Sequence, residues 1–151
     1  HSPEVLNTKA AVYVYKGNNE KAIELLQTNT ELPQARYNLA LLKAQERKLQ
    51  EAYTLMQGYE DVNAAVVSLS VGDTQHAASI MDRFEYHTPL AEYVRALMAA
   101  RMQKEADEGA ARLEHALPDS RLKERMQTEP DFLPYLTTPA FQALTGGKDY
   151  E

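Results

Sequence analysis

Pairs of alanines twelve residues apart restrict the fold of this 151-residue chain more than any other feature. Each alanine lies in a stretch whose apolar residues recur at helical spacing, and a short turn signal separates the two stretches. In the first pair the signal is Gly17 followed by Asn18, a helix stop and a helix N-cap. Two helices joined by two or three residues run antiparallel, and alanines at the contact let them approach closely. The pairs are Ala10 with Ala22, Ala40 with Ala52, and Ala65 with Ala77.

The same two-helix unit is expected four times. Aligning the small residue of each second helix gives steps of 30, 25 and 32 residues, with either Gly109 or Ala111 in the fourth unit. The sequence therefore predicts an all-α fold in which residues 1–118 form four degenerate antiparallel helix pairs. The aligned small residues are Ala22, Ala52, Ala77 and Gly109.

The pattern changes after Pro118. Asp119 or Ser120 is expected to cap a helix that runs through Met126, and Pro130 and Pro139 each stand where a short helix begins. We expect residues 119–145 to form short capping helices that close the end of the helix stack, and residues 146–151 to form a flexible tail. The apolar residues available for this cap are Phe132, Leu133, Leu136, Phe141 and Leu144.

Charge and composition exclude several classes of protein. The net charge of −6 opposes nucleic-acid binding, and the densest basic stretch, Arg121 to Arg125, is interrupted by Glu124. No apolar run reaches the roughly 18 residues that a transmembrane helix requires. The chain has no cysteine, which excludes disulfides, thiolate metal sites and cysteine nucleophiles.

No catalytic or metal-binding motif is present. The four histidines, at positions 1, 76, 87 and 115, never stand four residues apart, and the acidic residues are scattered. A working acid–base pair needs an environment that separates the two pKa values, and nothing in the sequence indicates one. We therefore expect no enzymatic activity, no metal and no cofactor.

The repeated unit resembles the tetratricopeptide repeat. The first unit carries the small and apolar residues of that pattern, whereas the second has Arg47 where the turn glycine belongs and the third has Ser68 where a tyrosine belongs. The resemblance implies an α-solenoid of stacked helix pairs with a C-terminal helical cap, and a related repeat such as a Sel1-like array remains an alternative. The matching residues of the first unit are Leu6, Ala10, Tyr13, Gly17, Ala22 and Leu26.

In such a solenoid the first helix of each pair lines the concave face, where a protein or peptide binds. A carboxylate clamp of the kind that binds chaperone tails is not expected. Only Asn38 fits among the five positions that would form it, and none of the five is a cation that could pair with a carboxylate. These positions are Asn7, Ala11, Asn38, Tyr59 and Asn63. The candidate binding residues on this face are Asn7, Tyr15, Tyr37, Asn38, Gln45, Tyr59 and Arg101.

The sequence therefore predicts a non-catalytic scaffold that binds a protein or peptide partner. The alternative is an accessory domain of a larger bacterial envelope or secreted protein, which docks within its own chain. The chain opens at His1 without an initiator Met, so we expect either a processed product or an excised piece of a longer protein. The resemblance favours the bacterial envelope, in the periplasm or at the outer membrane, over the cytoplasm.

Overall fold

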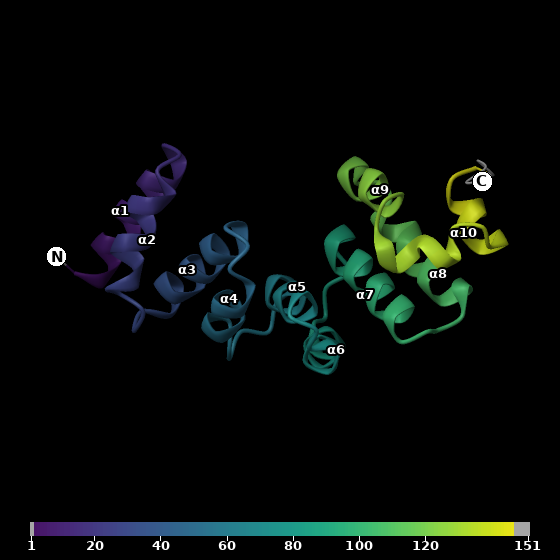
Figure 1. Ribbon diagram of the computed structural model, residues 1–151, viewed down its shortest axis with the longest axis horizontal. Coiled ribbons are helices and arrows are strands. Elements are labelled where there is room, and N and C mark those ends of the chain that lie inside the picture. Colours follow the sequence, from purple (N-terminus) through teal and green to yellow (C-terminus); the bar gives the residue numbers. More distant parts are fainter. Residues whose placement is uncertain (1, 147–151) are drawn as a thin grey trace. The chain divides into compact units, whose positions relative to one another are not determined.

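The computed structural model describes residues 2–146, and the regular elements among them are all helices (Figure 1). This confirms the predicted all-α class. The contacts group the chain into two compact units: unit 1 contains His1–Tyr59 and Val67–Asp73, and unit 2 contains Glu60–Val66 and Thr74–Glu151. The helices are α1 (Pro3–Tyr15), α2 (Asn19–Gln27), α3 (Pro33–Gln45), α4 (Leu49–Leu55), α5 (Val62–Ser70), α6 (Thr74–Arg83), α7 (Pro89–Arg101), α8 (Ala106–Ala116), α9 (Ser120–Met126), the 3-10 helix η1 (Pro130–Tyr135) and α10 (Pro139–Leu144).

The alanines spaced twelve residues apart are buried, as predicted. Ala22, Ala52 and Ala77 have no exposed surface, and their partners on the preceding helices are at most 1% exposed. In unit 1, α1 packs against α2 and α3 packs against α4 (Figure 1). A side chain larger than methyl at these positions would separate the helices.

The first helix of each expected pair ends in the same turn. After α1, the N–H of Gly17 donates to the carbonyl of Val14 (2.9 Å), and the N–H of Asn18 donates to that of Tyr13 (2.8 Å). This pair of bonds defines a Schellman motif, which requires a left-handed residue after the helix. The same two bonds recur after α3, α5 and α7. The left-handed residues are Gly17, Arg47, Gly72 and Gln103.

The structure fixes the register of the fourth pair at Gly109. A Cβ on Gly109 of α8 would lie 3.6 Å from the Phe141 ring and 3.9 Å from the carbonyl oxygen of Ala96 on α7, whereas Ala111 is exposed. Ala96 stands seven residues before its left-handed residue, as Ala10 does in the first pair. However, α8 begins one residue later after its left-handed turn residue than the other second helices do. The distance in sequence between the two small residues of the pair, Ala96 and Gly109, is therefore thirteen instead of twelve.

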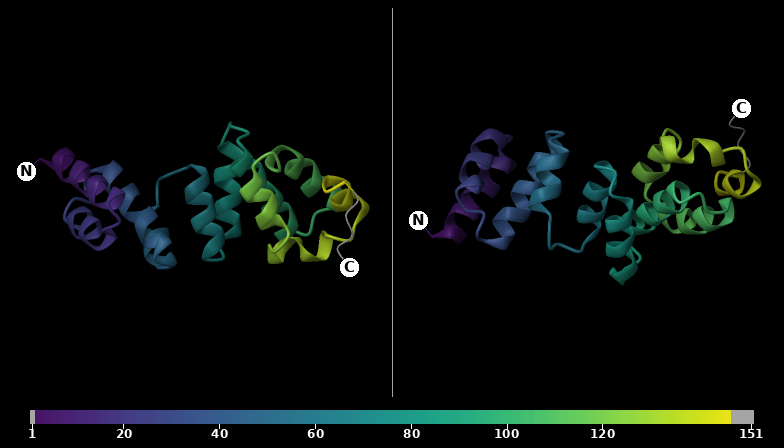
Figure 2. Two further views of the ribbon diagram at one scale, coloured as in Figure 1. Left: turned by 90° about the horizontal axis from the view of Figure 1, so that it is seen from above. Right: turned by 60° about the horizontal axis from the view of Figure 1, so that its bottom comes forward.

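The C-terminal elements pack on α7 and α8 within unit 2 (Figure 2). Asp119 caps α9 and Thr138 caps α10, and Phe132 and Phe141 are fully buried. The short helix that begins at Pro130 is a 3-10 helix, and Pro134 inside it has no N–H to continue an α-helical ladder. One detail differs from the prediction: Leu133 is 56% exposed instead of packed. Of the expected tail, residues 147–151 lie outside the described part.

None of the described helices has the length and apolar character that crossing a membrane requires.

Candidate functional site

A groove of about 220 Å³ lies between α1 and α3 in unit 1. It forms there because Ala10 and Ala11 on α1 are too small to fill the space that Leu41 and Leu42 of α3 leave open. Its walls are apolar, but Asn38 and Gln45 place two amide groups along it, one in each half of α3. The lining residues are Ala10, Ala11, Val14, Leu26, Asn38, Leu41, Leu42 and Gln45.

The amide of Asn38 is held in place by two neighbours. Its Nδ2 donates to Oδ1 of Asn7 on α1 (3.1 Å), and its Oδ1 accepts from Nε2 of Gln34 one turn earlier on α3 (3.3 Å). This network ties α1 to α3 beside the groove. It leaves the second acceptor position of the Asn38 oxygen and the second N–H of the Asn38 amide for further hydrogen bonds.

Helix α1 exposes four large apolar residues, Val5, Val12, Val14 and Tyr15. Val14 lines the groove and is 38% exposed, and the next residue, Tyr15, is 92% exposed. Exposed apolar residues beside a groove are typical of a binding surface.

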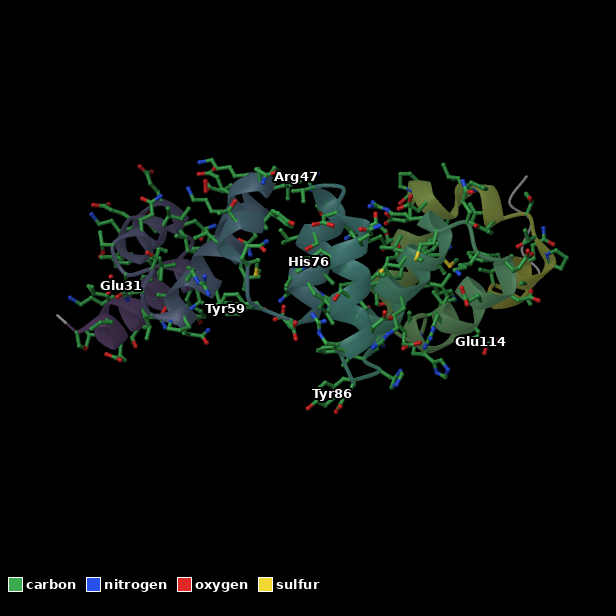
Figure 3. All side chains as sticks on the ribbon, turned by 90° about the horizontal axis from the view of Figure 1, so that it is seen from below. Glu31, Arg47, Tyr59, His76, Tyr86 and Glu114 are labelled. Atoms are coloured by element: carbon green, nitrogen blue, oxygen red, sulfur yellow. The ribbon has the colours of Figure 1, made fainter. Side chains whose placement is uncertain are left out.

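Tyr59 does not lie on the first helix of a pair, which corrects the prediction. Gly58 adopts a left-handed conformation and Asp61 caps α5 through the N–H of Ala64 (2.9 Å), so Tyr59 falls in the connecting segment between α4 and α5. Its ring packs edge-on against Tyr37 with centroids 5.1 Å apart, and its hydroxyl donates to the carbonyl of Pro33 (Figure 3).

The guanidinium of Arg36 lies 4.9 Å from the centre of the Tyr59 ring. Tyr37 and Tyr59 form an aromatic cluster near the start of α3. Tyr59 contacts three residues of that helix there: Tyr37, Arg36 and the carbonyl of Pro33. Neither tyrosine lines the groove between α1 and α3.

Arg101 lies in unit 2, where its Nε donates to Oδ2 of Asp131 (3.0 Å). This pair joins α7 to η1. The structure thus brings together Asn7, Asn38 and Gln45, with Tyr15 adjacent to the groove. It places the aromatic cluster elsewhere in unit 1 and Arg101 in the other unit.

Sequence reasoning missed a buried carboxylate in unit 2. Glu92 on α7 is 1% exposed, and its Oε1 lies 2.8 Å from Nδ1 of His87 and 2.7 Å from Nη1 of Arg95. Nη1 of Arg112 on α8 lies 3.5 Å from Oε2. One signal in the sequence points to this cluster: Glu92 stands among the apolar residues of α7, three residues before an arginine.

Burial alone would raise the pKa of Glu92. Hydrogen bonds from His87 and Arg95, together with the charges of Arg112 and Arg95, outweigh it and hold the pKa below its ordinary value. Arg95 also donates to the carbonyls of Phe84 (2.7 Å) and Tyr86 (3.0 Å). The cluster therefore fastens the segment between α6 and α7 to the start of α7, although the Tyr86 side chain itself projects into solvent (Figure 3).

Two open grooves, of about 400 and 440 Å³, adjoin this cluster. His87 beside a buried carboxylate has the geometry of a general base and its orienting group. Yet none of the described residues that line either groove carries a hydroxyl or a thiol that His87 could activate. Arg95 and Arg112 pair with the Glu92 carboxylate, and these contacts join α7 to α8 and to the segment before α7.

Comparison with known proteins adds no relative: no family model matches the sequence, and neither a curated protein nor a solved structure matches it significantly.

Proposed function

We propose that this protein is a non-catalytic scaffold whose groove between α1 and α3 holds an extended segment of a partner polypeptide. The observation that carries the proposal is that one groove combines apolar walls with two amide side chains, of which that of Asn38 is held by Asn7. We further propose that the helix pairs stack in the manner of tetratricopeptide repeats. The turn that recurs after α1, α3, α5 and α7 supports this part of the proposal.

The chemistry of the groove suits a peptide main chain. An extended peptide presents N–H and C=O groups at regular intervals, and each must keep a hydrogen-bond partner when it leaves water. An amide side chain both donates and accepts, so Asn38 and Gln45 can pair with either group. The apolar walls formed by Val14 and Leu41 can then receive a side chain of the peptide, as pockets in peptide-binding proteins do.

A catalytic role is not proposed, and the state of Glu92 supports that choice. Its carboxylate is held by Arg95, Arg112 and His87, and the groove residues beside it supply no hydroxyl or thiol nucleophile within the described part. The buried Glu92 carboxylate has a structural explanation, because it binds His87 and Arg95 and so holds the segment between α6 and α7 against the start of α7.

The test is selection of peptides from a random library on the intact protein, followed by binding measurements with matched variants. Ala11→Arg places a long charged side chain in the groove from an exposed position. Thr8→Arg adds the same side chain to α1 outside the groove. Selected peptides should bind Ala11→Arg at least about tenfold more weakly than the unaltered protein and should bind Thr8→Arg normally.

Amide chemical shifts give an independent measurement. On peptide addition the changes should cluster at residues 10–14 and 38–45. Equal binding by both variants, or shifts confined to other residues, would contradict the proposed groove.

A further inference from the structure

Lys43 on α3 is a buried cation with a single loose partner among the described residues. Its side chain is 8% exposed, and its Nζ lies 3.6 Å from Oε1 of Glu51 on α4, beyond hydrogen-bond distance. The Glu51 side chain is itself 58% exposed and free to move away. An ammonium carries three N–H donors, and leaving them unpaired away from water is costly.

A second groove, of about 360 Å³, has Lys43 and Glu51 among its lining residues. It is formed by α2, α3 and α4, and it shares no lining residue with the groove between α1 and α3. Leu39 and Leu55 give it apolar walls, and the side-chain amides of Gln27 and Gln50 supply further donors. The groove thus combines one largely buried lysine side chain with a surface for hydrocarbon.

We propose that this groove binds a monocarboxylate with an apolar tail. The carboxylate replaces Glu51 as the partner of Lys43 and accepts hydrogen bonds from its ammonium, and the tail lies over Leu39 and Leu55. One negative charge matches one ammonium, whereas the second charge of a phosphate would find no further cation among the residues that line this groove. This small-ligand site is separate from the peptide groove and does not depend on the proposed function.

Calorimetric titration with octanoate, acetate and octanol separates the two contributions. Octanoate should bind more tightly than acetate, which has no tail, and more tightly than octanol, which has no charge. Lys43→Met keeps the length and apolar stem of the side chain and should weaken octanoate binding at least about tenfold. Glu51→Gln removes the competing carboxylate, so it should strengthen octanoate binding.

Lys48→Met is the matched control, because Lys48 stands in the turn after α3 with its side chain 51% exposed, paired loosely with Glu46. It should leave octanoate binding unchanged. In the unaltered protein, amide shifts on octanoate addition should fall at residues 39–43 and 50–55. Octanol binding as tightly as octanoate, unchanged or weaker binding by Glu51→Gln, or shifts confined to other residues would each overturn the proposal, even if Lys43→Met fails to fold.

Discussion

At Arg47 and Gln103 a residue with a side chain occupies the left-handed backbone region, with φ of 65° and 57°. The equivalent turns after α1 and α5 use Gly17 and Gly72. A Cβ clashes with the backbone in this region, and glycine avoids the clash. The turn nevertheless forms at all four sites, so the helix contacts on either side stabilise it more than the strain opposes it.

Relieving this strain should stabilise the protein. Arg47→Gly is expected to raise the free energy of unfolding by about 0.5–1 kcal/mol. This is the net effect of two opposing contributions: glycine relieves the backbone strain of the folded state, but it also increases the conformational entropy of the unfolded chain. Arg47→Ala removes the same side chain but keeps the strain, so it should give no gain. Urea unfolding followed by circular dichroism measures both, and equal stabilities of the two variants would show that the turn is unstrained.

Glu92 should contribute more to stability than any exposed acidic residue. Replacing it with alanine leaves Arg95, whose side chain is 12% exposed, without its carboxylate, and breaking such a buried pair costs about 3–5 kcal/mol. Glu114→Ala on the exposed side of α8 is the control and should change stability by no more than about 0.5 kcal/mol. Similar urea midpoints for the two variants would refute the structural role of the Glu92 cluster.

The sequence predicts the burial of the alanines, but it gives no such signal for Lys43 and, for Glu92, only its place among the apolar residues of α7. Ala22 and Ala52 recur at a fixed distance from their partners, and periodicity reveals such positions. A charged residue is buried only when other elements cover it, and the covering groups of Glu92 come from α8 and from the segment before α7. Which elements cover a residue depends on the tertiary structure, and local sequence patterns do not show it.

At the scale of the helix, Gly109 is a residue of α8 that faces both the Phe141 ring and the backbone of Ala96 on α7. A methyl group added at this residue would meet its nearest atoms, in Phe141 and Ala96, at ordinary van der Waals distances. Gly109→Ala should therefore stabilise the protein by up to about 1 kcal/mol, because alanine favours the helical state over glycine.

Gly109→Leu tests the same contact in the opposite direction. Its longer side chain would have to displace the ring of Phe141, and overpacking of this kind costs about 1–3 kcal/mol. Thermal unfolding should place Gly109→Ala above the unaltered protein and Gly109→Leu below it. A stable Gly109→Leu would mean that α8 does not pack closely at this residue.

Helices and their caps were predictable because their signals are local. Asn18, Asp119 and Thr138 cap helices as their positions in the sequence indicate. The prediction for Tyr59 is wrong because the step from the second to the third unit is only 25 residues, so the repeat spacing does not hold there. In that step Gly58 and Asp61 delay the start of α5. Of the residues that line the groove between α1 and α3, only Asn38 and Gln45 were among the predicted binding residues, because the apolar walls depend on how the two helices meet.

At the scale of the whole molecule, the two units differ in how their stability should depend on pH. The pKa of Glu92 is below its ordinary value in the folded state, so below about pH 4.5 the unfolded chain takes up this proton more readily than the folded one. The stabilisation by Glu92 is therefore complete above that value and is lost as the pH falls through the lowered pKa. Glu92 belongs to unit 2, and its contacts hold α7, α8 and the segment before α7 together.

Acid should therefore loosen unit 2 before unit 1. Hydrogen exchange measured by mass spectrometry at pH 7 and at pH 4, corrected for the intrinsic rates, should show protection falling more in α7 and α8 than in α1 to α4. The Glu92→Gln variant is the control, because it has no titrating group at this position. Between pH 7 and pH 4 its helices α7 and α8 should lose less protection against exchange than those of the unaltered protein. A uniform loss across both units, or the same pH dependence in Glu92→Gln, would mean that the acid response does not originate at Glu92.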